Sequence, residues 1–95
     1  MDFEWDDAKA AANLAKHGVP FDLAHAFDFE AAVIRVDDRR NYGEVREVAH
    51  GPIGKRLHVL VFTRRGSAVR VISLRAANRR EAIRYLADAK EFDSE

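Results

Sequence analysis

The 95-residue sequence contains no cysteine, one tryptophan and two prolines. A chain without cysteine has neither disulfides nor thiolate metal ligands, which is compatible with a reducing compartment. It has no apolar run near the ~20 residues of a membrane-spanning helix. Its N-terminus is acidic where a signal peptide is basic and then apolar. We expect a soluble cytoplasmic protein with a single domain, since 95 residues suffice for one core.

The motifs for several kinds of chemistry are absent as well. His25, His50 and His58 show neither HxxxH nor HxH spacing, so the sequence predicts no metal site. There is no glycine-rich phosphate loop and no nucleophile elbow. No cofactor is therefore expected.

What the sequence has in excess is arginine, and most of it lies in the middle. Residues 39–80 contain ten arginines and Lys55 against two acids, Glu44 and Glu47, a net charge of +9. Residues 1–38 sum to −6 and residues 81–95 to −3, so the total charge of zero conceals a cationic segment. Arginine forms paired hydrogen bonds with phosphate or carboxylate. The middle of the chain is therefore predicted to meet an anion.

The first third of the chain predicts one strand and two helices. Residues 2–5 alternate polar and aromatic side chains, as a short strand does. An alanine-rich helix follows Asp6 as its N-cap and ends at Gly18. Pro20 then opens a second, short helix.

The rest of the chain predicts four strands and a last helix. Stretches with strand character cover residues 31–36, 44–51, 57–63 and 68–75. Asn78 and Glu81 form a capping box for the helix, whose expected buried face is Ala82, Leu86 and Ala89. The order is β-α-α-β-β-β-β-α, an α+β fold with an antiparallel sheet packed by helices. We expect one domain over residues 1–90 and a frayed tail at 91–95.

Two groups of polar residues are candidates for binding or proton transfer. Lys9, Asn13, Lys16 and His17 form one stripe on the first helix. Spacing alone favours a solvated helix face over a ridge that contacts phosphate. Glu44 and Arg46 share one face of a strand, where an ordinary ion pair is commoner than a proton acceptor beside a cation.

Two further candidates lie near the C-terminus. Arg70 and Arg75 belong to an apolar strand and have opposite parity along it. A half-buried guanidinium needs a partner, either a carboxylate such as Glu44 or Glu81 or a bound phosphate. Tyr85 follows on the last helix, where packing on the core is the commoner role of a tyrosine.

Three segments together resemble one known family. They are WDDAKAAANLAKHGVPF (5–21), DDRRNYGEVR (37–46) and VRVISLRAANRREAIRY (69–85). Their order and their WDxxKxxxNxxKHGVxF, GExR and RxISxR patterns are similar to the BrnT family, the toxins of a type II toxin–antitoxin system. The resemblance extends from Phe3 to about Tyr85. One departure is Ala82, where members often have arginine.

The resemblance implies a RelE-like fold and metal-independent RNA cleavage that halts translation. It also implies a BrnA-type ribbon-helix-helix antitoxin, with operator DNA bound only through that antitoxin. The family's recurring polar positions fall on ten residues of this sequence: Lys9, Asn13, Lys16, His17, Glu44, Arg46, Arg70, Arg75, Glu81 and Tyr85.

Cleavage of RNA without a metal needs a base, cations around the phosphate and an acid. We expect Arg46, Arg70 and Arg75 to bind the phosphate. Glu44 is the first candidate for the base and His17 the second, while Tyr85, Lys16 or His17 is the acid. The remaining RNA contacts are assigned to the polar residues of both helices: Lys9, Asn13, Lys16, His17, Arg79 and Arg80.

Two other interpretations stay open at this point. In one, the arginines grip nucleic acid or an acidic partner protein without cleavage. In the other, they only satisfy internal carboxylates.

Overall fold

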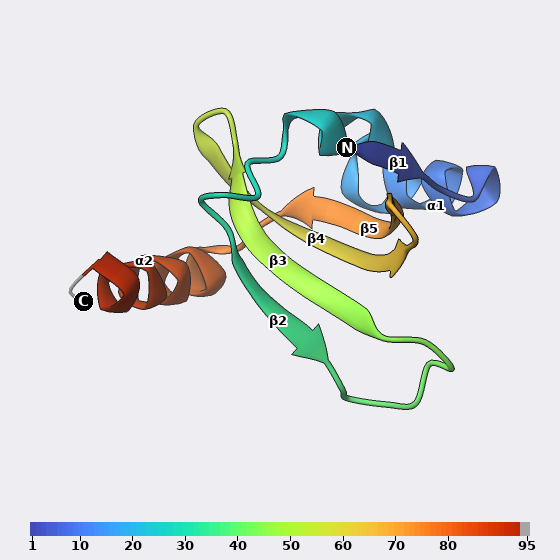
Figure 1. Cartoon of the computed structure of the whole chain (residues 1–95). Coiled ribbons are helices and arrows are strands. Elements are labelled where there is room, and N and C mark those ends of the chain that lie inside the picture. The colour runs from blue at the N-terminus through green and yellow to red at the C-terminus, as the bar shows by residue number, and fades with distance from the viewer. Residues whose placement is uncertain (94–95) are drawn as a thin grey trace.

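The computed structural model describes residues 1–93, with side chains described through residue 89. The chain forms five strands, two α-helices and one short 3₁₀ segment between α1 and β2, and Figure 1 shows how they are arranged. In chain order these are β1 (Asp2–Glu4), α1 (Asp7–His17), η1 (Phe21–Ala26), β2 (Val33–Asp37), β3 (Arg46–Ile53), β4 (Arg56–Arg65), β5 (Ala68–Ala76) and α2 (Arg79–Asp93).

The strands form one mixed sheet in the order β1-β5-β4-β3-β2. Strands β2 to β5 are antiparallel neighbours, whereas β1 runs parallel to β5. The α+β prediction is confirmed, and the prediction of a purely antiparallel sheet is wrong at β1. Only three residues of β1 pair with β5, and a segment so short carries no pattern that sets its direction.

The second predicted helix is a 3₁₀ segment. The amide of Leu23 donates to the carbonyl of Pro20, and the amide of Phe27 donates to that of Ala24, each at 3.1 Å. Pro20 is extended at φ −75° and ψ 145°, and Phe27 is extended again at the other end. Six residues between two extended ends leave room for little more than one α-helical turn, and such short pieces favour the tighter 3₁₀ form.

The core lies between one face of the sheet and the α1–η1 layer. Phe21, Ala24 and Phe27 from η1 and its end pack against Leu60, Phe62 and Leu74 of the central strands. Asn13 of α1 holds the edge of β5: its Nδ2 donates to the Leu74 carbonyl at 2.8 Å, and its Oδ1 accepts from the Leu74 amide at 3.2 Å. The pairing of β1 with β5 ends at Arg70. Beyond that point the side-chain amide of Asn13 supplies hydrogen bonds to the main chain of β5 at Leu74.

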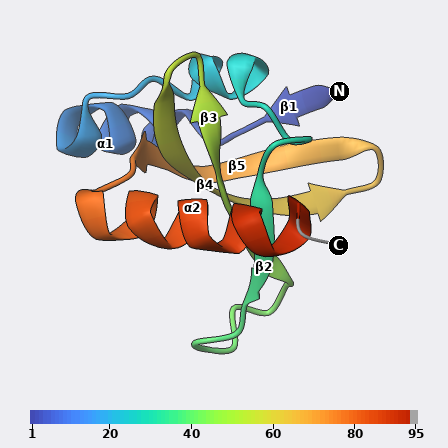
Figure 2. The same ribbon diagram turned by 90° about the vertical axis from the view of Figure 1, so that its left-hand side faces the viewer.

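Helix α2 lies on the opposite side of the sheet from α1 and η1 (Figures 1 and 2). It contacts β2 and β3 through polar side chains, and Leu86, which we expected to be buried, is 61% exposed. The predicted buried face was therefore wrong at Leu86, whereas its other two members, Ala82 and Ala89, are half-buried. The helix continues through Asp93 into the expected tail, and residues 94–95 lie outside the described part.

Candidate functional site

The face of the sheet turned away from the core, called the open face below, carries most of the predicted site residues. Strand register places Arg46, Val48 and His50 of β3 on it, opposite Val61 and Val59 of β4. The register of β5 adds three more residues, Arg70, Ser73 and Arg75.

A β-bulge brings Arg70 and Arg75 to this same face. Arg75 pairs with Val59 and Ser73 with Val61, but Val71 pairs with Phe62 and Arg70 with Thr63. Ile72 is the extra residue, so the alternation of β5 shifts by one between the two arginines. The prediction that the two arginines lie on opposite faces of the strand, made from their opposite parity, was therefore wrong. Both cations face the same surface because the strand is irregular.

Glu44 lies between two guanidinium groups at one end of the open face. Its carboxylate is 3.7 Å from Arg46 Nε and 3.6 Å from Arg65 Nη2. Neither contact is short enough to be a hydrogen bond. The side chain of Glu44 is 31% exposed, so its oxygens remain accessible as acceptors.

Arg46 has a hydrogen-bond donor that no described residue uses. Among the side chains that the structure describes, its Nε is the one buried nitrogen or oxygen without a hydrogen-bond partner. The guanidinium lies over the ring of Tyr42, 4.1 Å from the centroid, a cation–π contact that fixes its plane. A buried donor without an acceptor is costly, and an anion at this place would satisfy it.

Asp37 holds the loop that carries Tyr42 and Glu44. It accepts from the Arg39 guanidinium at 2.8 and 2.9 Å, from the Arg39 amide at 3.3 Å and from the Tyr42 hydroxyl at 3.0 Å. These donors, Arg39 first, hold the pKa of the Asp37 carboxyl well below its usual range. The chain of contacts from Asp37 through Tyr42 to Arg46 sets the position of the guanidinium.

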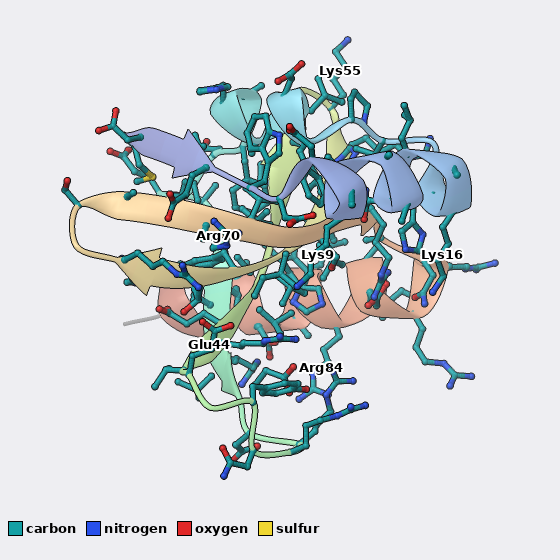
Figure 3. The ribbon with its side chains drawn as sticks, turned by 90° about the vertical axis from the view of Figure 1, so that its right-hand side faces the viewer. Lys9, Lys16, Glu44, Lys55, Arg70 and Arg84 are labelled. Carbon is teal, nitrogen blue, oxygen red and sulfur yellow. The ribbon has the colours of Figure 1, made fainter. Side chains whose placement is uncertain are left out.

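Arg70 is the second cation with little internal compensation. Its nearest carboxylate, that of Glu4, is 4.0 Å away, and its side chain is 28% exposed. Arg70 pairs with Thr63 of β4, and the neighbouring Phe62 pairs with Glu47 of β3. Arg70 and Arg46 are therefore two strands apart, roughly 10 Å. Figure 3 shows Arg70 and Glu44 on the side of the molecule below α1, with Lys9 projecting from the helix above them.

Arg75 is fully engaged within the protein. Its two terminal nitrogens donate to the two oxygens of Glu81 at 2.7 and 2.9 Å. The Asn78 amide also donates to Glu81, and His50 Nε2 lies 3.6 Å away. These neighbours, Arg75 above all, lower the pKa of Glu81 to about 2.

Tyr85 anchors α2 to the segment before β2. Its hydroxyl donates to the Ala31 carbonyl at 2.6 Å. It also lines a cavity of about 250 Å³ under α2, together with Arg35, His50, Glu81 and others. The structure thus groups Tyr85 with Arg75 and Glu81, and groups Glu44 with Arg46.

The stripe predicted on α1 divides into two parts. Lys9, Lys16 and His17 line a shallow hollow beside Ile72 and Ser73 of β5. Asn13 also borders the hollow, but it is buried, and its side-chain amide forms hydrogen bonds with the main chain of Leu74 and Val19. Asn13 therefore has a structural role here, while the cations beside it remain available.

The two arginines that open α2 stand apart from this hollow. Arg79 lines a groove between α2 and the β3–β4 turn, where Lys55 and Arg56 also lie. Arg80 is exposed in the first turn of the helix.

Sequence reasoning missed three residues of the site: Asp37, Tyr42 and Arg65. The first two stand in the DDRRNYG run (37–43), between two predicted strands, where the sequence predicts no site residue. A buried acid followed by arginine and tyrosine is a signal of a loop held by side chains.

Within residues 1–93 no three His, Cys, Asp or Glu residues are placed to hold a metal ion. None of the helices in that part is long and apolar enough to cross a membrane.

Comparison with protein-family models gives a match. The family model described as the ribonuclease toxin, BrnT, of a type II toxin–antitoxin system matches residues 5–81. A search of the curated proteins finds no match. The matched range contains the loop of Glu44, both arginines of β5 and the first turn of α2.

Proposed function

Because the chain belongs to the BrnT family of ribonuclease toxins from type II toxin–antitoxin systems, we propose that it cleaves RNA on the open face without a metal ion. Arg46 and Arg70 bind the phosphate of the scissile bond, and Glu44 is the base. We also propose that the fold is RelE-like and that the toxin acts in the cytoplasm, where it halts translation.

The observation that carries this proposal is the buried Nε of Arg46, which has no partner among the described side chains. The guanidinium is already oriented by Tyr42, so little reorganisation is needed when an anion arrives. Preoriented donors of this kind stabilise charge that develops in a transition state. Arg70, about two strand spacings away, would bind the same phosphate from the β5 side.

In the proposed reaction Glu44 accepts the proton of a ribose 2′-hydroxyl. The 2′-oxygen then bonds to phosphorus, the bond to the 5′-oxygen breaks, and an acid protonates the departing oxygen. The products are a 2′,3′-cyclic phosphate and a 5′-hydroxyl. Lys16 or His17 is better supported as the acid than Tyr85, because the Tyr85 hydroxyl already donates to the Ala31 carbonyl.

The α1 cations extend this site along the RNA. Lys9, Lys16 and His17 face a hollow that adjoins Ser73 of the open face, and we assign them contacts to the phosphate backbone. Arg75 has a supporting role in this scheme, since it fixes Glu81 and the start of α2. The antitoxin is proposed to be a BrnA-type ribbon-helix-helix protein that also binds the operator DNA.

The test is RNA cleavage by the purified chain in EDTA. We expect Arg46→Ala, Arg70→Ala and Glu44→Gln to lower the cleavage rate by about 100- to 1,000-fold, as removal of one charge-stabilising donor does elsewhere. Arg64→Ala is the matched control. Arg64 is an exposed arginine of β4 next to Arg65, but it pairs with Glu47 at the edge of the core side.

Three outcomes would contradict the proposal. An equal loss of cleavage in Arg64→Ala would show that the effect does not depend on the position of the arginine on the open face. Cleavage that needs added Mg²⁺ would reject metal independence. Tight RNA binding without any cleavage would support the alternative function, a binding module that grips RNA through the same arginines.

A further inference from the structure

Helix α2 turns polar side chains toward the sheet and apolar side chains toward solvent. Glu81 binds Arg75, Tyr85 binds the Ala31 carbonyl and Asp88 binds Arg35 at 2.6 Å. On the outer side Ile83 is 59% exposed and Leu86 is 61% exposed. A surface helix ordinarily buries its apolar stripe, so this arrangement indicates that something else covers the stripe.

A groove continues from this stripe toward the β3–β4 turn. It measures about 390 Å³, and Pro52, Leu57 and Leu86 contribute apolar walls. Three cations, Lys55, Arg56 and Arg79, line the same groove. None of these cations appears in an ion pair within the described residues. The surface therefore combines exposed aliphatic side chains with uncompensated positive charge.

We propose that this surface, Ile83 and Leu86 with the adjoining groove, is where the antitoxin docks, through a segment with both apolar and acidic side chains. The apolar residues of the segment would cover Leu86 and the groove walls, and its carboxylates would face Lys55, Arg56 and Arg79. Complementary charge of this kind orients partners and accelerates association. The inference rests on the proposed function only in that it requires an antitoxin.

Two other occupants fit these observations less well. RNA would pair with the cations, but its sugars and phosphates would leave the aliphatic side chains of Ile83 and Leu86 poorly matched. A second copy of this chain would cover the aliphatic stripe, but it would bring its own three cations to the same contact. An acidic and apolar protein segment satisfies both features at once.

The experiment uses the tagged chain co-expressed with the protein encoded by the adjacent gene. Size exclusion and calorimetry would then measure complex formation by Leu86→Glu, Ile83→Glu and the double variant Lys55→Glu/Arg56→Glu. We expect the dissociation constant of Leu86→Glu to rise by about 100-fold or more, as for a central interface residue. The Leu86→Glu toxin should still cleave RNA and should no longer be inhibited.

Val36→Glu is the matched control, because Val36 is 62% exposed but lies on β2, away from the groove. Arg70→Ala is the second control, and both should bind the antitoxin within about threefold of the unaltered chain. Leu86→Met should retain binding, and circular dichroism melts should show that each variant is folded.

Several results would overturn the inference. One is antitoxin binding that survives Leu86→Glu and Ile83→Glu but fails with Val36→Glu or Arg70→Ala. Another is a dimer of the free chain that Leu86→Glu dissociates while the antitoxin still binds. Weakened RNA binding by Leu86→Glu, with antitoxin binding intact, would assign the surface to RNA. A chain that binds the antitoxin through α2 but does not cleave RNA would reject the proposed function alone.

Discussion

Arg46 and Arg75 are alike in sequence terms, since both are strand arginines within matched motifs, but their surroundings differ. Arg75 makes two short hydrogen bonds to Glu81, whereas Arg46 has a buried Nε without a partner and only a long contact to Glu44. A guanidinium whose donors are used internally has less to offer a phosphate. Because of this difference we propose that Arg75 supports α2 and does not bind the phosphate.

We accordingly expect Arg75→Ala to act mainly on stability. It leaves Glu81 without its principal partner. Hydrogen bonds to charged groups contribute about 1.5–3 kcal/mol, and because the Arg75 side chain is 34% exposed, we expect the free energy of unfolding to fall by the smaller amount of about 1–2 kcal/mol. The melting temperature should fall by roughly 5–15 °C for a domain of this size. Thermal melts and cleavage assays below the transition separate stability from activity.

Arg35→Ala is the comparison for this prediction. Arg35 also pairs with a carboxylate of α2, Asp88, but its side chain is 51% exposed, so its loss should change both stability and cleavage little. An Arg75→Ala protein that melts like the parent chain yet cannot cleave RNA would return Arg75 to the phosphate site.

A second prediction at this scale concerns Tyr42. Tyr42→Phe keeps the ring under Arg46 but loses the hydroxyl that binds Asp37. Tyr42→Ala loses both, and a cation–π contact contributes about 0.5–2 kcal/mol. We expect kcat/KM for RNA to fall by about tenfold with alanine and by about two- to threefold with phenylalanine. Equal losses in the two variants would mean that the anchor to Asp37, and not the ring, positions Arg46.

At the scale of elements, local signals predicted the helix ends well. The Asp6 side chain accepts from the Lys9 amide at 3.0 Å, and Gly18 closes α1 at φ 72°. Asn78 and Glu81 form the reciprocal capping box at 2.8 and 2.9 Å. These features depend on three or four neighbouring residues, so a sequence contains all the information that they need.

Features that depend on distant residues were not predictable in the same way. The parallel direction of β1 depends on its pairing with β5, more than 60 residues later in the chain. The bulge at Ile72 depends on the register with β4, and without it the face shared by Arg70 and Arg75 could not be assigned. The outward apolar side of α2 follows from polar contacts to β2 and β5 that the helix sequence does not contain.

The contact between α2 and the sheet should depend on pH. In the folded state the hydrogen bonds from Arg75 lower the pKa of Glu81 to about 2, from an ordinary value of about 4.5. A lowered folded-state pKa means that the stabilisation is complete above the unfolded-state pKa and is lost as pH falls from about 4.5 toward 2. Glu81→Gln removes this titration.

Melting temperatures of the parent chain and Glu81→Gln, measured from pH 7 to pH 2.5, check this expectation. The parent chain should be more stable near neutrality, and the two curves should converge as the pH falls. Curves that stay parallel over the whole range would show that Glu81 does not titrate differently in the folded and unfolded states.

At the scale of the whole molecule, a chain with zero net charge can bind a polyanion only if its charges are segregated. Much of the +9 middle segment is compensated internally: Arg64 pairs with Glu47 and Arg75 with Glu81. Other cations face solvent without a carboxylate partner among the described residues, as Lys9 and Lys16 do in the hollow beside β5. The number of these cations that touch RNA sets how steeply binding responds to salt.

The last prediction measures that number. For single-stranded nucleic acid the slope of log K against log salt is about −0.7 for each phosphate neutralised. If Lys9 and Lys16 each contact one phosphate, the Lys9→Ala/Lys16→Ala double variant should have a slope shallower by about 1.4. Lys55→Ala is the control, because Lys55 lies in the β3–β4 turn, on the opposite side of the molecule from α1 in Figure 1. Fluorescence anisotropy with a non-cleavable 2′-deoxy oligonucleotide, between 50 and 300 mM KCl, gives the slopes. An unchanged slope in the double variant, or an equal change in Lys55→Ala, would remove α1 from the RNA path and confine binding to the arginines of the open face.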